Sequence, residues 1–121
     1  MEDIRISDMM HMQRKLWELH KDTWSPMEPE YGRNFILWMM EEIDESIAVI
    51  KKKGDAAIME DPNVRQSFIE EMSDVLMYFT DTLLRYNVTP EEISAAYVNK
   101  HERNMGRNYQ SEYSDKYGAK G

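Results

Sequence analysis

Apolar side chains recur every three or four residues along most of this chain, the spacing of one face of an α-helix. This spacing predicts four helices, over about residues 6–22, 31–53, 62–87 and 90–105. No stretch alternates between apolar and polar residues over the length of a strand. The pattern therefore predicts an all-α protein whose helices form a four-helix bundle.

Each predicted helix has an apolar stripe that we expect to face the core. In the first helix the stripe is Met9, Met12, Leu16 and Leu19. In the second it is Phe35, Ile36, Met39, Ile43, Ile47 and Ile50. In the third it is Phe68, Met72, Val75, Leu76, Phe79 and Leu83, and in the fourth Ile93, Ala96 and Tyr97. A bundle this thin, with 11 methionines, leaves a further apolar face uncovered. We therefore expect the chain to form a homodimer or homotetramer.

Local signals mark where the helices begin and end. Ser7 is the expected N-cap of the first helix, and Gly54 the residue that ends the second. Asp61-Pro62 is expected to begin the third helix, and Thr89-Pro90 with Glu92 forms a capping box for the fourth. Residues 1–107 are therefore predicted to form one domain. Residues 108–121 have little periodicity, which favours an extended tail or an arm that clasps a partner.

Charge and composition narrow the classes of function. The net charge of −8 argues against binding to nucleic-acid polymers, which present a dense negative charge, but not against a mononucleotide. With no cysteine, disulfides, thiol catalysis and zinc–thiolate sites are excluded. No signal peptide or membrane-spanning segment is evident, so we expect a cytoplasmic protein that does not enter the membrane.

Two acidic motifs interrupt the apolar faces of the second and third helices. The first motif is Glu41-Glu42-x-x-Glu45 and the second is Glu71-x-x-Asp74. Residues three or four apart share a helical face, so each motif presents neighbouring carboxylates. If the two helices fold back antiparallel, four or five carboxylates meet in a small volume.

A cluster of carboxylates is costly because like charges repel and burial removes their water. A bound cation compensates, and oxygen ligands beside phosphates favour Mg²⁺, with Mn²⁺ as a substitute. The alternative is that these are solvated charges on ordinary surface helices. Against it, Glu42 and Glu45 share a stripe with Trp38, and Glu71 and Asp74 share one with Tyr78.

A second polar group lies near the end of the fourth helix. Lys100, Asn104 and Arg107 are spaced at i, i+4 and i+7 and supply the donors that suit phosphate. The alternative is that the cations offset the negative end of the helix dipole. Together the two groups indicate metal-assisted hydrolysis of a polyphosphate, with Glu41 as a candidate base that activates water.

The candidate contacts to a base are one polar residue and three tryptophans. Gln13 and Trp17 share a second face of the first helix, which also suits a subunit interface. Trp24 lies in a proline-containing loop, where it either stacks on a base or covers the end of the bundle. Trp38 precedes the first acidic motif.

The motifs E-E-x-x-E, E-x-x-D and K-x-x-x-N-x-x-R in this order resemble those of the MazG-like nucleoside triphosphate pyrophosphohydrolases, over roughly residues 10–107. That all-α superfamily includes dimeric dUTPases and phosphoribosyl-ATP pyrophosphohydrolases. The resemblance implies Mg²⁺-dependent hydrolysis of a (deoxy)nucleoside triphosphate to the monophosphate and pyrophosphate, in house-cleaning of the nucleotide pool. It also implies a dimer or tetramer whose sites draw residues from two subunits.

The resemblance also implies roles for individual residues. Glu42, Glu45, Glu71 and Asp74 correspond to Mg²⁺ ligands, and Glu41 to the water-activating base or a residue that supports the ligands. Lys100, Asn104 and Arg107 correspond to phosphate contacts, and Gly106 puts the placement of Arg107 in question because glycine ends helices.

There are four alternatives to this interpretation of the same residues. A di-iron bundle needs Glu-x-x-His pairs, and none occurs; an EF-hand loop is also lacking. A non-catalytic helical oligomerisation or adaptor module, or a degenerate family member that binds nucleotides without cleaving them, stays open.

Overall fold

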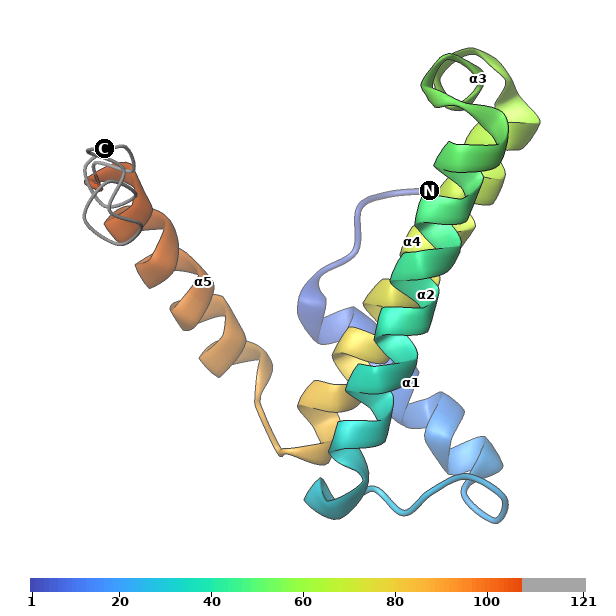
Figure 1. Ribbon diagram of the computed structural model, residues 1–121. Coiled ribbons are helices and arrows are strands. Elements are labelled where there is room, and N and C mark those ends of the chain that lie inside the picture. The colour runs from blue at the N-terminus through green and yellow to red at the C-terminus, as the bar shows by residue number, and fades with distance from the viewer. Residues whose placement is uncertain (108–121) are drawn as a thin grey trace, which may run out of the picture. The chain divides into compact units, whose positions relative to one another are not determined.

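The computed structural model describes residues 1–107, whose regular elements are all helical (Figure 1). The elements in order are α1 (Ile6–His20), the short 3-10 helix η1 (Pro29–Tyr31), α2 (Gly32–Lys53), α3 (Asp55–Glu60), α4 (Pro62–Arg85) and α5 (Pro90–Met105). None of residues 1–107 lies in a strand, so the all-α prediction is confirmed for this part of the chain. No helix in the described range is both long and apolar enough to cross a bilayer.

The chain forms two compact units, residues 1–90 and residues 91–121. In the first unit α4 contacts α1, α2 and α3. Helix α2 runs antiparallel to α4, as expected from the acidic motifs, and α3 connects them (Figure 1). The described part of the second unit is α5 and the two residues after it, and the predicted tail, 108–121, lies outside the described residues.

Most of the predicted helix ends are correct because the residues there satisfy backbone groups. Gly54 has φ +86°, which a side chain would disfavour, and its N–H donates to the Ile50 carbonyl at 2.9 Å. The Asp61 carboxylate accepts from the Asn63 N–H at 2.9 Å and caps α4.

The predicted N-cap at Ser7 is wrong. Helix α1 begins at Ile6, and the flanking residue is Arg5. The Arg5 backbone N–H donates to the Asp8 carboxylate at 2.9 Å. An acidic side chain at the third helical position therefore fixes the start of α1, as in one half of a capping box.

The predicted inward faces of α1 and α2 are partly wrong. In α1 the buried residues are Met10 and Gln13, whereas Met12, Leu16 and Leu19 are exposed. In α2 Phe35 is buried, but four other members of the predicted stripe are exposed: Ile36, Ile43, Ile47 and Ile50. Two members of the α4 stripe, Met72 and Leu76, are also exposed, as is Tyr97 on α5. Periodicity shows that a helix has an apolar face, but it does not show whether the same chain covers that face.

A buried ion pair ties α4 to the loop between α1 and α2. Arg85 is 0% exposed, and its Nε donates to Asp81 Oδ1 at 2.6 Å. Its Nη1 donates to the backbone carbonyls of Ser25 and Pro26. The guanidinium lies 3.7 Å from the centre of the Phe35 ring, a cation–π contact.

The Asp81 carboxylate also receives a hydrogen bond from α1, because Gln13 Nε2 donates to Asp81 Oδ2 at 3.1 Å. Arg85 Nη2 is buried and has no hydrogen-bond partner within residues 1–107. The pair thus joins α1, the following loop, α2 and α4, although the removal of two charges from water is costly.

We expect Asp81→Leu to lower the free energy of unfolding by about 3–5 kcal/mol, because it leaves the Arg85 charge buried without its counter-ion. The double variant Asp81→Leu/Arg85→Met should lose less than Asp81→Leu alone, because neither charge is then left unpaired. Urea unfolding followed by circular dichroism measures both. A double variant that is less stable than the single one would contradict the proposed cost of the unpaired charge.

Candidate metal and nucleotide site

The antiparallel packing of α2 on α4 brings three carboxylates together. Glu42 comes from α2, and Glu71 and Asp74 come from adjacent turns of α4. One carboxylate oxygen from each lies within 4.8 Å of those from the other two. Glu42 and Glu71 are half-buried. We refer to Glu42, Glu71 and Asp74 as the acidic trio.

The surroundings of Glu42 disfavour its negative charge. Burial is the largest cause that raises the pKa of the Glu42 carboxyl above its ordinary value, followed by the negative charges of Asp74, Glu71 and Glu45. A hydrogen bond between the Glu42 and Glu71 side chains acts in the same direction. The trio therefore favours a positive species, either a proton or a cation, between its carboxylates.

The donor set of the trio fits a hard divalent cation. All three groups are carboxylates, and oxygen ligands of this type suit Mg²⁺ or Mn²⁺. Three charges facing one small volume also supply the electrostatic attraction that a divalent ion needs to lose part of its water. Exposed acidic groups are common without an ion, and a proton also compensates the charge that raises the pKa of Glu42, so the trio is a candidate metal site.

Glu45 and Glu41 lie outside the trio. Glu45 is exposed, and it lines a separate surface hollow with Lys52 and Lys53. Its charge still contributes to the raised pKa of Glu42. Glu41 is exposed, and its charge is one of those that raise the pKa of Tyr78. Of the five acidic residues singled out in the sequence, three therefore converge and two flank them.

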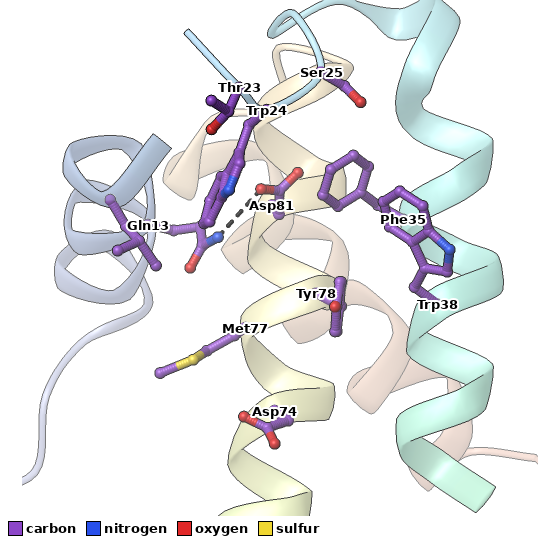
Figure 2. Close-up of a pocket in the computed structure, with 11 residues that line it drawn as sticks. Gln13, Thr23, Trp24, Ser25, Phe35, Trp38, Asp74, Met77, Tyr78 and Asp81 are labelled. Carbon is purple, nitrogen blue, oxygen red and sulfur yellow. Dashed lines mark hydrogen bonds between the residues drawn. The ribbon is translucent and has the colours of Figure 1, made fainter. Parts of the chain in front are cut away.

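A cavity of about 450 Å³ adjoins the trio, and Asp74 belongs to both. Its walls come from α1, α2, α4 and the loop before η1. Figure 2 shows Trp24 on one side of the Asp81 carboxylate and Phe35 and Trp38 on the other. The volume is in the range of small-ligand sites, and the walls combine flat aromatic surfaces with a few polar groups.

Three of the four candidate base contacts line this cavity: Gln13, Trp24 and Trp38. Trp17 does not, and its indole Nε1 instead donates to the backbone carbonyl of Ser25 at 2.8 Å. Trp17 therefore anchors the loop that carries Trp24. Trp24 itself stacks on His20, with ring centroids 4.7 Å apart.

The sequence patterns did not single out Asp81 and Arg85, and they did not predict that Tyr78 lines the cavity. Asp74, Tyr78, Asp81 and Arg85 are spaced at i, i+4, i+7 and i+11, so they share one face of α4. That spacing was a usable signal. Burial and then the charges of Glu42 and Asp74 raise the pKa of the Tyr78 phenol, which keeps it neutral and able to donate.

The predicted phosphate-binding residues lie at the end of α5, in the second unit. Lys100 and Asn104 are in the helix, which ends at Met105, and Arg107 follows Gly106 beyond it. All three side chains are exposed, and Arg107 Nη1 donates to Asn104 Oδ1 at 3.1 Å. The interruption expected from Gly106 is present, and Arg107 nevertheless contacts Asn104.

Comparison of the chain with protein-family models, with curated proteins and with solved structures gave no match in any of the three cases. The resemblance to the MazG-like enzymes therefore rests on the sequence motifs alone.

The raised pKa of Glu42 gives a pH-dependent prediction. Because the folded state favours protonated Glu42, its contribution to stability is present at low pH and is lost as the pH rises through the folded-state pKa. Glu42→Gln mimics the protonated form, so metal-free Glu42→Gln should melt at a higher temperature than the natural protein at neutral pH. The difference should shrink as the pH is lowered and Glu42 takes up a proton.

Thermal melts of the metal-free protein at a series of pH values measure this effect. Asp44→Asn is the matched control, because Asp44 is exposed on the same helix and is not part of the trio. A lower melting temperature for Glu42→Gln at neutral pH would show that the trio is not electrostatically strained.

Proposed function

We propose that the protein is a Mg²⁺-dependent pyrophosphohydrolase, which converts a (deoxy)nucleoside triphosphate and water to the monophosphate and pyrophosphate. The observation that carries this proposal is that Asp74 belongs both to the acidic trio and to the aromatic cavity. A metal-binding group beside a cavity of nucleobase size matches a ligand with a flat base at one end and a phosphate chain at the other.

In this proposal the carboxylates of Glu42, Glu71 and Asp74 hold the cation, and Glu45 adds to the negative field around them. When bound, Mg²⁺ neutralises charge on the phosphate oxygens and makes water more acidic. Glu41 is the proposed base that accepts a proton from the attacking water. Water adds to phosphorus, the bond between the α phosphate and the bridging oxygen to the β phosphate breaks, and pyrophosphate leaves.

The remaining residues bind and orient the substrate. The cavity holds the base between Trp24 and the rings of Phe35 and Trp38. Lys100, Asn104 and Arg107 of the second unit are proposed to bind phosphate, as the resemblance implies, because an ammonium, an amide and a guanidinium can all donate to phosphate oxygens. All three side chains are exposed.

We expect Mg²⁺-dependent release of pyrophosphate from at least one nucleoside triphosphate. Glu71→Gln should lower kcat/KM by at least about a hundredfold, because it removes a charged ligand of the metal. Glu70→Gln is the matched control, since Glu70 is the exposed neighbour on α4 and lies outside the trio. A coupled pyrophosphate assay over the natural ribo- and deoxynucleotides measures the rates.

Each negative outcome of this assay has a distinct meaning. Equal loss of activity in both variants would argue against the trio as the site. Mg²⁺ binding without turnover of any nucleotide would instead indicate a degenerate, binding-only protein. If the protein neither binds Mg²⁺ nor turns over a nucleotide, the non-catalytic helical module is the better description.

We also propose that the protein associates with copies of itself through α2. Five apolar residues on this helix follow a spacing of four and three residues and are each 39–59% exposed. They are Ile36, Met40, Ile43, Ile47 and Ile50. This a/d-type pattern is the seam by which helices of separate chains associate, and a monomer would leave it in water.

Ile43→Glu/Ile47→Glu should shift the protein toward the monomer, because two charges would enter the centre of the α2 seam. Sedimentation velocity measures the shift. Met59→Glu is the control, since Met59 is 70% exposed and lies on α3, outside the seam. A natural protein that sediments as a monomer at high concentration would contradict the association.

A further inference from the structure

The Gln13–Asp81 pair forms a buried polar part of the cavity wall. Gln13 is 9% exposed and Asp81 is 1% exposed, yet both line the cavity. The other side chains around them include the rings of Trp24, Phe35 and Trp38. A base that enters between these rings would therefore bring its polar edge to Gln13 and Asp81.

The hydrogen bonds between Gln13, Asp81 and Arg85 determine which atoms of this wall are donors and which are acceptors. Asp81 Oδ1 accepts from Arg85 Nε, and Asp81 Oδ2 accepts from Gln13 Nε2. Because a carboxylate only accepts, the Gln13 amide must present its nitrogen to Asp81. The Gln13 oxygen therefore points away from Asp81, as Figure 2 shows.

The atoms left for a ligand are acceptors. Within residues 1–107 no donor contacts Gln13 Oε1, although the side chain is nine-tenths buried. Asp81 Oδ2 keeps a second lone pair beyond the one that accepts from Gln13. This part of the wall thus requires N–H groups from whatever occupies the cavity.

We propose that the cavity selects nucleobases with an exocyclic amino group, namely cytosine, adenine or guanine, over uracil and thymine. The amino group donates to Gln13 Oε1 and Asp81 Oδ2. In uracil and thymine a carbonyl oxygen stands where cytosine has its amino group, so the single N3–H can donate to only one of the two acceptors and the carbonyl oxygen would face the other. This inference rests on the proposed function, because it takes the ligand to be a nucleotide.

We expect the cavity to bind some bases more tightly than others, because a buried polar atom without a hydrogen-bond partner raises the free energy of the complex. A base that fills the cavity excludes water from Gln13 Oε1 and must itself supply a hydrogen-bond donor to that oxygen. A base without the donor leaves that oxygen unpaired. We therefore expect a loss in affinity of about ten- to a hundredfold.

Matched ligands test the amino group in the natural protein. The monophosphates of deoxycytidine and of its 2-pyrimidinone analogue differ only by a hydrogen in place of the amino group. Those of adenosine and purine riboside form a second such pair. Calorimetry with Mg²⁺ present should show about ten- to a hundredfold weaker binding of each analogue. Equal binding within both pairs, or no binding of any of the four, would overturn the inference.

This experiment separates the inference from the proposed reaction, because a monophosphate binds without being cleaved. If triphosphates are hydrolysed but the pairs bind equally, base selection by Gln13 and Asp81 is wrong and the reaction stands. If the pairs differ but no triphosphate is hydrolysed, the reaction is wrong and base selection stands.

A variant identifies the acceptor. Gln13→Leu removes Oε1 and leaves Asp81 Oδ2 in the wall, so it should bind deoxycytidine monophosphate and its analogue with a smaller difference in affinity than the natural protein does. Gln66→Leu is the control, because Gln66 is an exposed glutamine on α4 outside the cavity lining, and it should keep the full difference. If Gln13→Leu folds and keeps the full difference, Gln13 is not an acceptor for the amino group. If it does not fold, the ligand pairs in the natural protein still decide the inference.

Discussion

The buried guanidinium of Arg85 is the contact on which the rest of the first unit depends. It holds Asp81 on its own helix, the backbone carbonyls of the loop after α1, and the Phe35 ring of α2. A buried charge is stable only beside suitable hydrogen-bond and ion-pair partners. It therefore restricts the relative positions of these segments more strongly than apolar contacts would. The loop that carries Trp24 is thereby held against α4, and the cavity wall is formed.

One face of α4 connects this structural pair to the candidate chemistry. Asp81 is shared between Arg85 and the cavity, Tyr78 lies one turn away, and Asp74 belongs to the acidic trio. Toward the N-terminus along this face, the buried Asp81–Arg85 ion pair gives way to Asp74 and the other carboxylates of the trio, which form no salt bridge with a cation of residues 1–107. This change in charge along α4 suits a nucleotide. Its base would contact polar atoms held in fixed positions, and its phosphates would bind together with a cation.

The apolar surface of α2 is the other unusual property of the fold. Few apolar residues are buried in the first unit, and the seam from Ile36 to Ile50 is exposed along the helix. The same helix carries Glu42 on a different side, so association through the seam would leave the trio in place while stiffening the helix beneath it. Under the proposed function, α2 takes part in both the association and the reaction, because it carries both the seam and Glu42.

The amino-acid sequence by itself determined four of the five α-helices within residues 1–107 and most of their ends, because spacing, capping residues and glycine act within a few residues of one another. Gly54 and Asp61 are cases of this kind. Only the tertiary structure decided that Glu42 meets Glu71 and Asp74 while Glu45 lies aside, and that Gln13 reaches Asp81. Those outcomes depend on how helices distant in sequence are rotated against each other, and an apolar stripe does not report which side another helix covers.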